Sequence, residues 1–352
     1  MHITILTSGS RGDVQPYMAL ALGLRKAGYL VHFAAQEPLR ELVDTYGLEF
    51  IPIGADINVM LRDEKSRGML AAAGRNPLFN IGQIFQLARM TESLASKLLQ
   101  DAWHACQNTE AILCASNNYY AGAAIAEKLG CPLVCLSLLP LAPTRFHPSI
   151  LFPPLPTQLD FLERLGYNWA THAISWHLFW QMIRPWLNRI RKRVLDLPPR
   201  PIWLSMKASE KGPPRLYGFS PHVIYRPPDW PPIHHVTGYW FLDPPDGWQP
   251  PAALRDFLEA GSPPVYIGFG SMIEGQPEAL TEIVIQALQR ARQRGILTPG
   301  WGGLVASKVP TDVFIANDIP HAWLFPRVAA VVHHGGAGTT AAALRAGVPS
   351  VW

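Results

Sequence analysis

The chain has few charged residues and few cysteines for its length. Charged side chains make up 16% of its 352 residues, and the formal net charge is only +4. The basic residues are mostly dispersed, so we exclude nucleic acid as a partner. None of the four cysteines is spaced as in a CxxC motif, so we expect reduced, buried thiols and no metal site at Cys106, Cys114, Cys131 and Cys135.

Long apolar runs are missing as well. No segment approaches the roughly 20 apolar residues that a membrane-spanning helix needs. The chain opens directly on a strand pattern, without the basic region, apolar stretch and small-residue cleavage site of a secretory signal. We therefore expect a cytoplasmic protein.

Apolar residues are abundant, at 48%, and the twelve tryptophans are unusually many. The length exceeds the size at which one hydrophobic core stops growing, so we expect two domains. The alternation of strand and helix patterns breaks in an aromatic and Pro-rich insertion at about 140–212, and prolines cluster again between 213 and 251. We place an N-terminal domain at 1–235 and a C-terminal domain at 236–352.

Both halves have the pattern of a doubly wound parallel sheet. In the first half we predict strands at 2–7, 31–35, 49–53, 111–115 and 132–138, with helices at 16–27, 38–46, 81–106, 120–129 and 169–195. In the second half we predict strands at 265–269, 296–297, 313–315, 329–332 and 349–352, with helices at 277–293 and 340–345.

The segment 331–352 is the most informative. A strand pattern ends at two histidines, three glycines follow, and a helix pattern begins at Thr340. Such a turn directs unpaired amides and the positive end of a helix dipole at an anion, and His333, Thr339 and Thr340 can add hydrogen bonds to phosphate oxygens. The pattern therefore predicts a phosphate site, although many glycine turns only cap helices.

A second turn, TSGSRGDVQP, follows the first strand and carries Arg11 and Asp13. Loops at the carboxyl ends of parallel strands line the ligand crevice of open α/β sheets, so Asp13 is presented to a site. The alternative is that Asp13 is a helix N-cap, with Pro16 tolerated in the first turn.

The motifs GSRGDVQP, GYWFLDPP, VYIGFGSM, ILTPGWGGL, VVHHGGAGTT and RAGVPS resemble, in this order, the GT-B glycosyltransferases. The resemblance points to the sterol 3-beta-glucosyltransferase branch, with glycopeptide and macrolide glycosyltransferases as relatives. It implies two Rossmann-like, doubly wound α/β domains facing a cleft. The family pattern continues past the GVPS strand, so the second domain is expected to be incomplete.

The resemblance implies inverting transfer of a hexosyl group, glucose, from UDP-glucose to a hydroxyl of a sterol or similar apolar acceptor, giving a beta-glycoside. The UDP-sugar is a co-substrate, and no cofactor or metal is implied. Alternatives are a macrolide or glycopeptide acceptor, a noncatalytic lipid-binding remnant, and a sugar-nucleotide epimerase or hydrolase. A nicotinamide oxidoreductase is disfavoured because no strand precedes a GxGxxG with an acidic residue about 20 positions later.

Individual roles follow from the same resemblance. Asp13 occupies the place of the general base, and His333 that of the histidine that touches the donor diphosphate. The segment 318–323 is expected along the uracil and ribose. The residues expected to bind the nucleotide sugar are Ser10, Arg11, Gly12, Gly270, Ser271, Trp301, Ile319, His321, His333, Gly335, Gly336, Ala337, Gly338, Thr339 and Thr340.

Aromatic residues are concentrated in the predicted helix after position 167, and a basic end follows them. One hypothesis is an acceptor wall formed by Trp176, Phe179 and Trp180, whose basic end meets anionic headgroups at the inner membrane face. The alternative is a helix packed on its own domain with a solvated basic end.

Overall fold

The structure is a computed structural model, and the described chain divides into two compact units. The first unit comprises Met1–Gly9 and Leu20–Gly238, and the second comprises Ser10–Ala19 and Tyr239–Trp352. The structure describes residues 1–54, 81–156, 166–203, 212–270, 277–299 and 309–352. For residues 81–91 and 277–278 it describes the backbone only.

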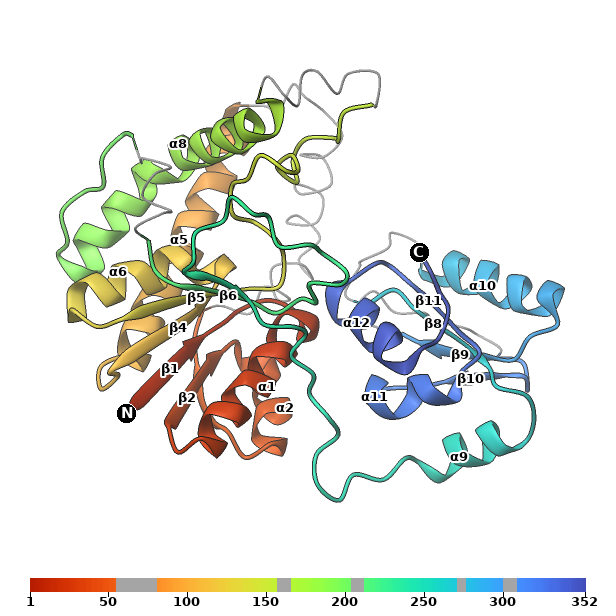
Figure 1. The fold of residues 1–352 in the computed structure, drawn as a ribbon. Helices are drawn as coiled ribbons and strands as arrows, with labels where there is room; N and C mark the ends of the chain where they lie inside the picture. The colour runs from red at the N-terminus through yellow and green to blue at the C-terminus, as the bar shows by residue number, and fades with distance from the viewer. Residues whose placement is uncertain (55–80, 157–165, 204–211, 271–276, 300–308) are drawn as a thin grey trace. The chain divides into compact units, whose positions relative to one another are not determined.

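Seven parallel strands form the sheet of the first unit, in the order β3-β2-β1-β4-β5-β6-β7 (Figure 1). All five residues of β4 are buried, as expected for a strand covered on both faces. The order reverses between β1 and β4, which places the ligand crevice of this sheet beyond the carboxyl ends of these two strands. The strands are β1 His2–Leu6, β2 Leu30–Ala35, β3 Glu49–Pro52, β4 Ala111–Ala115, β5 Leu133–Ser137, β6 Arg215–Tyr217 and β7 His234–Val236.

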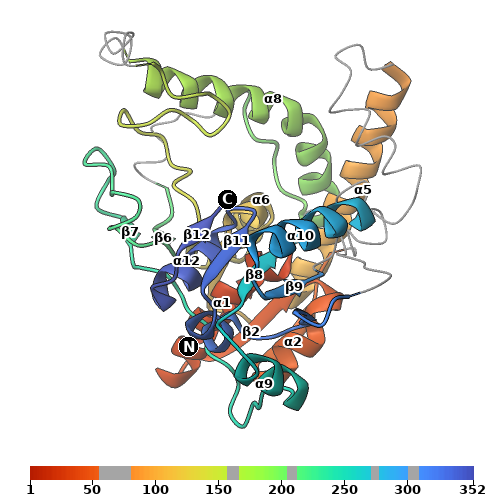
Figure 2. The ribbon, with the colours of Figure 1, turned by 90° about the vertical axis from the view of Figure 1, so that its right-hand side faces the viewer.

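Three helices share one core with the central strands of this sheet. Leu99, Ile125 and Ile190, one from each helix, are buried in a cluster with Leu6 of β1 and Ile112 of β4. Figures 1 and 2 both show the C-terminal part of α8 beside α5. The helices of this unit are α2 Arg40–Thr45, α5 Ile81–Ala105, α6 Tyr119–Leu129 and α8 Tyr167–Leu195. Helix α1 Arg11–Lys26 is divided between the units, with residues up to Ala19 in the second and residues from Leu20 in the first.

The second unit holds a five-stranded parallel sheet in the order β10-β9-β8-β11-β12. Its side chains alternate between two clusters: Tyr266 and Ile296 pack with α9, α11 and α12, whereas Ile267 and Leu297 pack with α10. The sheet is therefore covered on both faces. The elements are β8 Val265–Gly268, β9 Gly295–Thr298, β10 Val313–Ile315, β11 Ala330–His333, β12 Ser350–Val351, α9 Ala252–Glu259, α10 Pro277–Ala291, α11 His321–Leu324 and α12 Ala337–Ala346.

The sequence pattern placed most elements within a few residues and was wrong at several. Helix α1 begins at Arg11, so Pro16 is its sixth residue and lies beyond the first turn. The Pro-rich stretch 213–251 contains β6 and β7, which extend the first sheet. These three-residue strands are too short for an alternation pattern to be recognised. The sequence pattern also missed α9.

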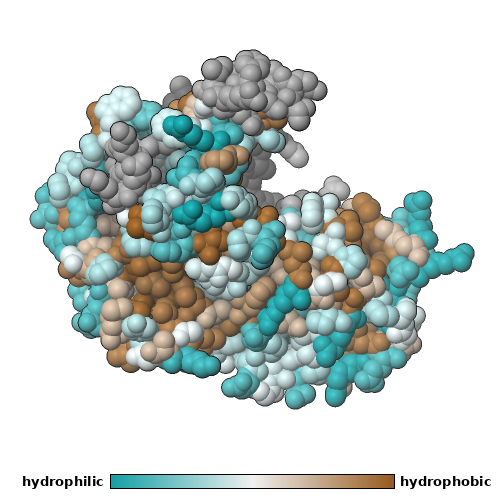
Figure 3. Space-filling view, viewed as in Figure 1, coloured by the Kyte–Doolittle hydropathy of each residue, from teal (hydrophilic) through white to brown (hydrophobic). Residues whose placement is uncertain are grey.

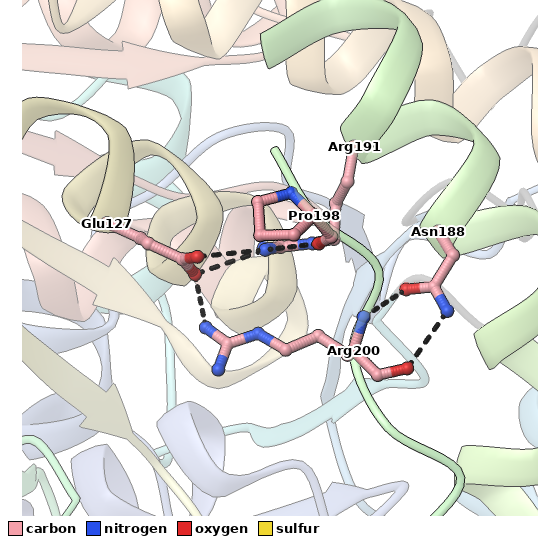
Figure 4. Close-up of polar contacts among 5 residues, drawn as sticks. All are labelled: Glu127, Asn188, Arg191, Pro198 and Arg200. Atoms are coloured by element: carbon pink, nitrogen blue, oxygen red, sulfur yellow. Dashed lines mark hydrogen bonds and ion pairs between the residues drawn. The ribbon is translucent and has the colours of Figure 1, made fainter. Parts of the chain in front are cut away.

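A network of ion pairs and hydrogen bonds joins the C-terminal end of α8 and the chain that follows it to α6 (Figure 4). The Arg191 guanidinium, 3% exposed, donates to both carboxylate oxygens of Glu127 on α6 at 3.1 Å, and to the Pro198 carbonyl at 3.3 Å. Arg200 also pairs with Glu127, and its backbone N–H donates to Asn188 Oδ1 at 2.8 Å. These contacts hold the chain after α8 against α6.

We expect Glu127→Ala to lower the free energy of unfolding by about 2 kcal/mol, because it leaves the buried Arg191 without its carboxylate partner. Urea denaturation of the purified chain measures the change. Glu37→Ala is the matched control, since it removes the exposed ion pair with Arg40 and is expected to leave stability nearly unchanged. Equal effects of the two substitutions would contradict the structural role of the network.

Candidate functional site

The first candidate site lies at the carboxyl ends of β8 and β11, where the strand order of the second sheet reverses. Strand β11 ends at His333, Gly335 adopts a left-handed conformation with φ 78°, and Gly336 caps α12. The N–H groups of the first turn of a helix have no partner within it. The sequence had predicted this strand, turn and helix, although α12 begins at Ala337 and not at Thr340.

His333 presents a hydrogen-bond donor at this turn. Its ring is 2% exposed, and Nδ1 accepts the Gly335 N–H at 3.1 Å. Burial, together with the neighbouring His334, lowers the pKa of His333, so the ring is neutral at pH 7. A neutral ring that accepts at Nδ1 carries its proton on Nε2. Nε2 is buried and has no partner among the described residues, which leaves the donor unused.

Two of the predicted glycines make room for a histidine ring. A Cβ on Gly270 would lie 2.4 Å from His334 Cε1, and one on Gly336 would lie 2.4 Å from His334 Nε2. The loop after β8 and the turn after β11 therefore meet at His334. No pattern in the sequence indicated this packing.

Gly338 differs from these glycines. It lies in the first turn of α12, its φ is not positive, and a Cβ there would meet nothing within 4 Å. Glycine costs about 1 kcal/mol relative to alanine inside a helix. Neither packing nor backbone conformation therefore requires a glycine here, whereas close approach of a ligand to the backbone would.

The two threonines of α12 are not equivalent. The Thr340 hydroxyl donates to the Gly336 carbonyl at 3.0 Å, and its backbone N–H donates to the same oxygen. The Thr340 hydroxyl proton is thus used within the helix in this structure, contrary to its predicted role as a phosphate donor. Thr339 and Ala337 lie in the same turn and remain candidates.

The segment before β11 contains His321 and Ile319. His321 Nε2 lies 3.2 Å from the Tyr266 hydroxyl, and its ring stacks on Phe325 at 4.3 Å. Burial lowers the pKa of His321 to about 4, so it is neutral at pH 7. Ile319 packs against the core of the unit. The predicted site residues Ser271 and Trp301 lie outside the described residues.

The second candidate site is the turn between β1 and α1. Asp13 Oδ2 accepts the Ser10 N–H and the Ser10 hydroxyl, both at 2.8 Å. Ser10 thus stands at the N-cap position of α1 and Asp13 is the third helical residue, whose carboxylate reaches back to the N-cap N–H as in half of a capping box. The Asp13 N–H donates to the Ser10 carbonyl. The structure therefore shows a capping role for the Asp13 carboxylate, which is also exposed. Arg11 and Gly12 complete the first turn of α1.

The third candidate is the aromatic part of α8, where the structure corrects one residue. Trp180 is 1% exposed, packs with Ile183 and Leu187, and donates Nε1 to the carbonyls of Pro201 and Ile202. It is a core residue and presents no surface to an acceptor. Phe179 is 45% exposed and remains a candidate.

Trp176 is partly buried, and its Nε1 has no partner among the described residues. The ring of Tyr120 lies 6.2 Å from that of Phe179 and 5.9 Å from that of Trp180. Sequence reasoning missed Tyr120. Its signal was its position at the start of α6, the helix that follows the buried strand β4, because parallel sheets place ligand-binding residues beyond the carboxyl ends of their strands.

Known protein families and individual proteins are similar to this chain in sequence. Residues 3–148 match the Glycosyltransferase family 28 N-terminal domain, and residues 296–352 match the Erythromycin biosynthesis protein CIII-like, C-terminal domain. A sterol 3-beta-glucosyltransferase of Arabidopsis thaliana is 36% identical over 353 residues, covering 99% of this chain and 56% of the relative. That of Emericella nidulans is 36% identical over 365 residues, covering 100% of this chain and 25% of the relative. The chain thus spans about half or less of these relatives.

Solved structures share the fold. The glycosyltransferase SnogD from Streptomyces nogalater superposes with a TM-score of 0.58 at 20% identity, covering 99% of this chain and 80% of SnogD. The Streptomyces sp. SF2575 glycosyltransferase SsfS6, complexed with thymidine diphosphate, gives 0.57 at 20% identity, covering 99% and 81%. The predicted architecture of two Rossmann-like parallel sheets is confirmed. The chain therefore has the fold of the GT-B glycosyltransferases, and its sequence is similar to those of the sterol 3-beta-glucosyltransferases.

Proposed function

We propose that the protein transfers glucose from UDP-glucose to the hydroxyl of a sterol and inverts the anomeric configuration to give a beta-glucoside. The observation that carries this proposal is the turn formed by His333, Gly335 and the start of α12. It lies in a chain that is 36% identical, over 99% of its own residues, to part of a sterol 3-beta-glucosyltransferase. Natural-product glycosyltransferases share the fold at 20% identity or less, which is a weaker argument for a macrolide acceptor.

The donor site supplies what the leaving group needs. As the bond to the anomeric carbon breaks, negative charge builds on the diphosphate. The Nε2–H of His333 and the free N–H groups at the start of α12 are fixed donors for that charge. Fixed dipoles lower the barrier because they need no reorganisation during the reaction. Among the described residues no group of three or more His, Cys, Asp or Glu side chains is arranged to hold a metal ion.

Asp13 is the proposed general base that removes the proton of the acceptor hydroxyl. Its Oδ2 accepts both bonds from Ser10, and among the described residues no hydrogen bond reaches Oδ1. The capping and catalytic roles are therefore compatible, since capping orients the carboxylate through one oxygen. Phe179 and Tyr120 are the proposed aromatic contacts of the flat acceptor.

The experiment that tests the proposal incubates the purified chain with UDP-glucose and cholesterol or ergosterol, and detects the glucoside by mass spectrometry. The coupling constant of the anomeric proton then reports the configuration. A macrolide aglycone offered in parallel tests the alternative acceptor. Sterol binding without affinity for UDP would support a noncatalytic lipid-binding protein and contradict the proposal.

We further propose that α8 contacts the membrane that holds the acceptor. The face that makes this contact differs from the tryptophan-bearing face that the sequence pattern had indicated. Ile174, Leu178 and Met182 follow one another at helical spacing and are 47%, 64% and 66% exposed. On the side drawn in Figure 3, α8 shows a mixture of apolar and polar side chains. None of the described helices is long and apolar enough to span a bilayer.

The basic residues at the C-terminal end of α8 contribute less to the proposed attraction to anionic headgroups than their number in the sequence predicted. Arg189 pairs with Glu92, Lys192 with Asp196, and the buried Arg191 with Glu127. Carboxylates thus offset most of this charge, and apolar burial is the larger proposed attraction.

We expect the double substitution of Leu178 and Met182 by Gln to weaken binding to neutral vesicles about tenfold or more, because each side chain gives up roughly 1 kcal/mol or more of burial. Vesicle flotation measures the bound fraction. Ile283→Gln, an equally exposed position on α10, is the control. Unchanged binding by the double variant would refute contact through this face.

A further inference from the structure

The turn between β1 and α1 is held by three amide side chains. Gln36, the residue after β2, accepts the Gly9 N–H through Oε1 at 2.9 Å. After β4, Asn117 donates Nδ2 to the Ser8 carbonyl at 2.6 Å, and Asn118 Oδ1 accepts the Ser8 hydroxyl at 2.5 Å. Strand β1 lies between β2 and β4, so these residues hold the turn from both sides.

This turn needs such support. Gly9 has a φ of 122°, which only glycine adopts readily, so the backbone alone does not favour a single path here. Gln36 is 7% exposed and Asn118 is 2% exposed, so their bonds are shielded from water and costly to leave unmade. The held segment runs directly into Ser10, whose N–H and hydroxyl bind the Asp13 carboxylate.

We propose that Gln36, Asn117 and Asn118 are positioning residues for Asp13. They touch neither the donor nor the acceptor in this role. They fix the turn, the turn fixes Ser10, and Ser10 fixes the Asp13 carboxylate. A base displaced by about 1 Å from its substrate proton loses roughly a hundredfold in rate, so small movements of the turn matter. The inference rests on the proposed function, in which Asp13 is the base.

The direction of the hydrogen bonds provides a sharp test. A backbone N–H always donates and a carbonyl always accepts, so Gln36 must accept and Asn117 must donate. Gln36→Glu keeps the acceptor, whereas Gln36→Leu removes it. Asn117→Asp keeps the size of the side chain but turns a carboxylate toward the Ser8 carbonyl. Acidic replacement should therefore be tolerated at 36 and harmful at 117.

The experiment measures kcat and the donor KM with UDP-glucose and a sterol, the Kd of UDP, and amide hydrogen exchange at Gly9 by NMR. We expect Gln36→Leu and Asn117→Asp to lower kcat about tenfold while the Kd of UDP stays within about twofold, because the diphosphate donors lie on β11 and α12. Amide hydrogen exchange at Gly9 should be faster in Gln36→Leu than in the unmodified chain. In Gln36→Glu, both kcat and the exchange rate at Gly9 should return to the values of the unmodified chain. Gln107→Leu, which loses an exposed bond to the Trp103 carbonyl, is the control.

Unchanged kcat in Gln36→Leu with faster exchange at Gly9 would overturn the proposal, since the turn would then be released without effect on the base. Equal losses in Gln36→Leu and Gln36→Glu would overturn it too, because the acceptor bond would not be what matters. Failure of the unmodified chain to transfer sugar would instead refute the proposed function, and with it the base that these residues serve.

Discussion

Asp13→Asn is expected to lower kcat for sterol glucosylation about a thousandfold, with the affinity for UDP unchanged within about twofold. Asparagine cannot take the proton of the acceptor hydroxyl, so general-base catalysis is lost. Its side-chain oxygen can still accept the bonds from Ser10, and the start of α1 should persist. The isosteric change therefore separates the two roles that the structure permits for this residue.

The measurement is steady-state kinetics with UDP-glucose and cholesterol, beside calorimetric titration of UDP. Asp44→Asn, a change at an exposed carboxylate of α2, is the matched control and should leave both values unaltered. If Asp13→Asn transfers glucose at the rate of the unmodified chain, Asp13 is a capping residue only. Parallel loss of UDP affinity would place the carboxylate in donor binding.

His333→Asn is expected to weaken UDP binding roughly tenfold to a hundredfold, the loss typical of one hydrogen bond to a charged group. The asparagine amide oxygen takes the place of Nδ1 and can still accept the Gly335 N–H, but the Nε2 donor is gone. His333→Gln reverses this pattern, because its amide nitrogen reaches the place of Nε2. Gln should therefore retain most of the affinity that Asn loses.

Titration of UDP into the two variants by calorimetry, with thermal unfolding as a check on folding, measures the contrast. Equal weakening by Asn and Gln would mean that His333 acts through the shape of the turn and not through its Nε2 donor. Full affinity in both variants would remove His333 from the donor site. The phosphate site would then rest on the amides of α12 alone.

Local patterns predicted much of the fold. The buried strand at Ala111–Ala115 was placed to the residue because five apolar residues bounded by turn signals are typical of a parallel strand. The glycine turn after His333 was recognised because its conformation depends on adjacent residues. Strands β6 and β7 were missed because three residues show no periodicity, and their pairing depends on the neighbouring strand β5.

Residue patterns along the chain were sufficient to predict the alternation of strands and helices, the turns that end β1 and β11, and the resemblance to the GT-B glycosyltransferases. Which side chains those turns leave available depends on contacts that form only in the folded molecule. Helical spacing placed Trp176 and Trp180 on one face of α8 but could not say that Trp180 would be covered. The bonds of Gln36, Asn117 and Asn118 join residues 27, 109 and 110 positions apart. Such contacts exist only once β2, β1 and β4 lie side by side, because a short hydrogen bond depends on distance in space and not on separation in sequence.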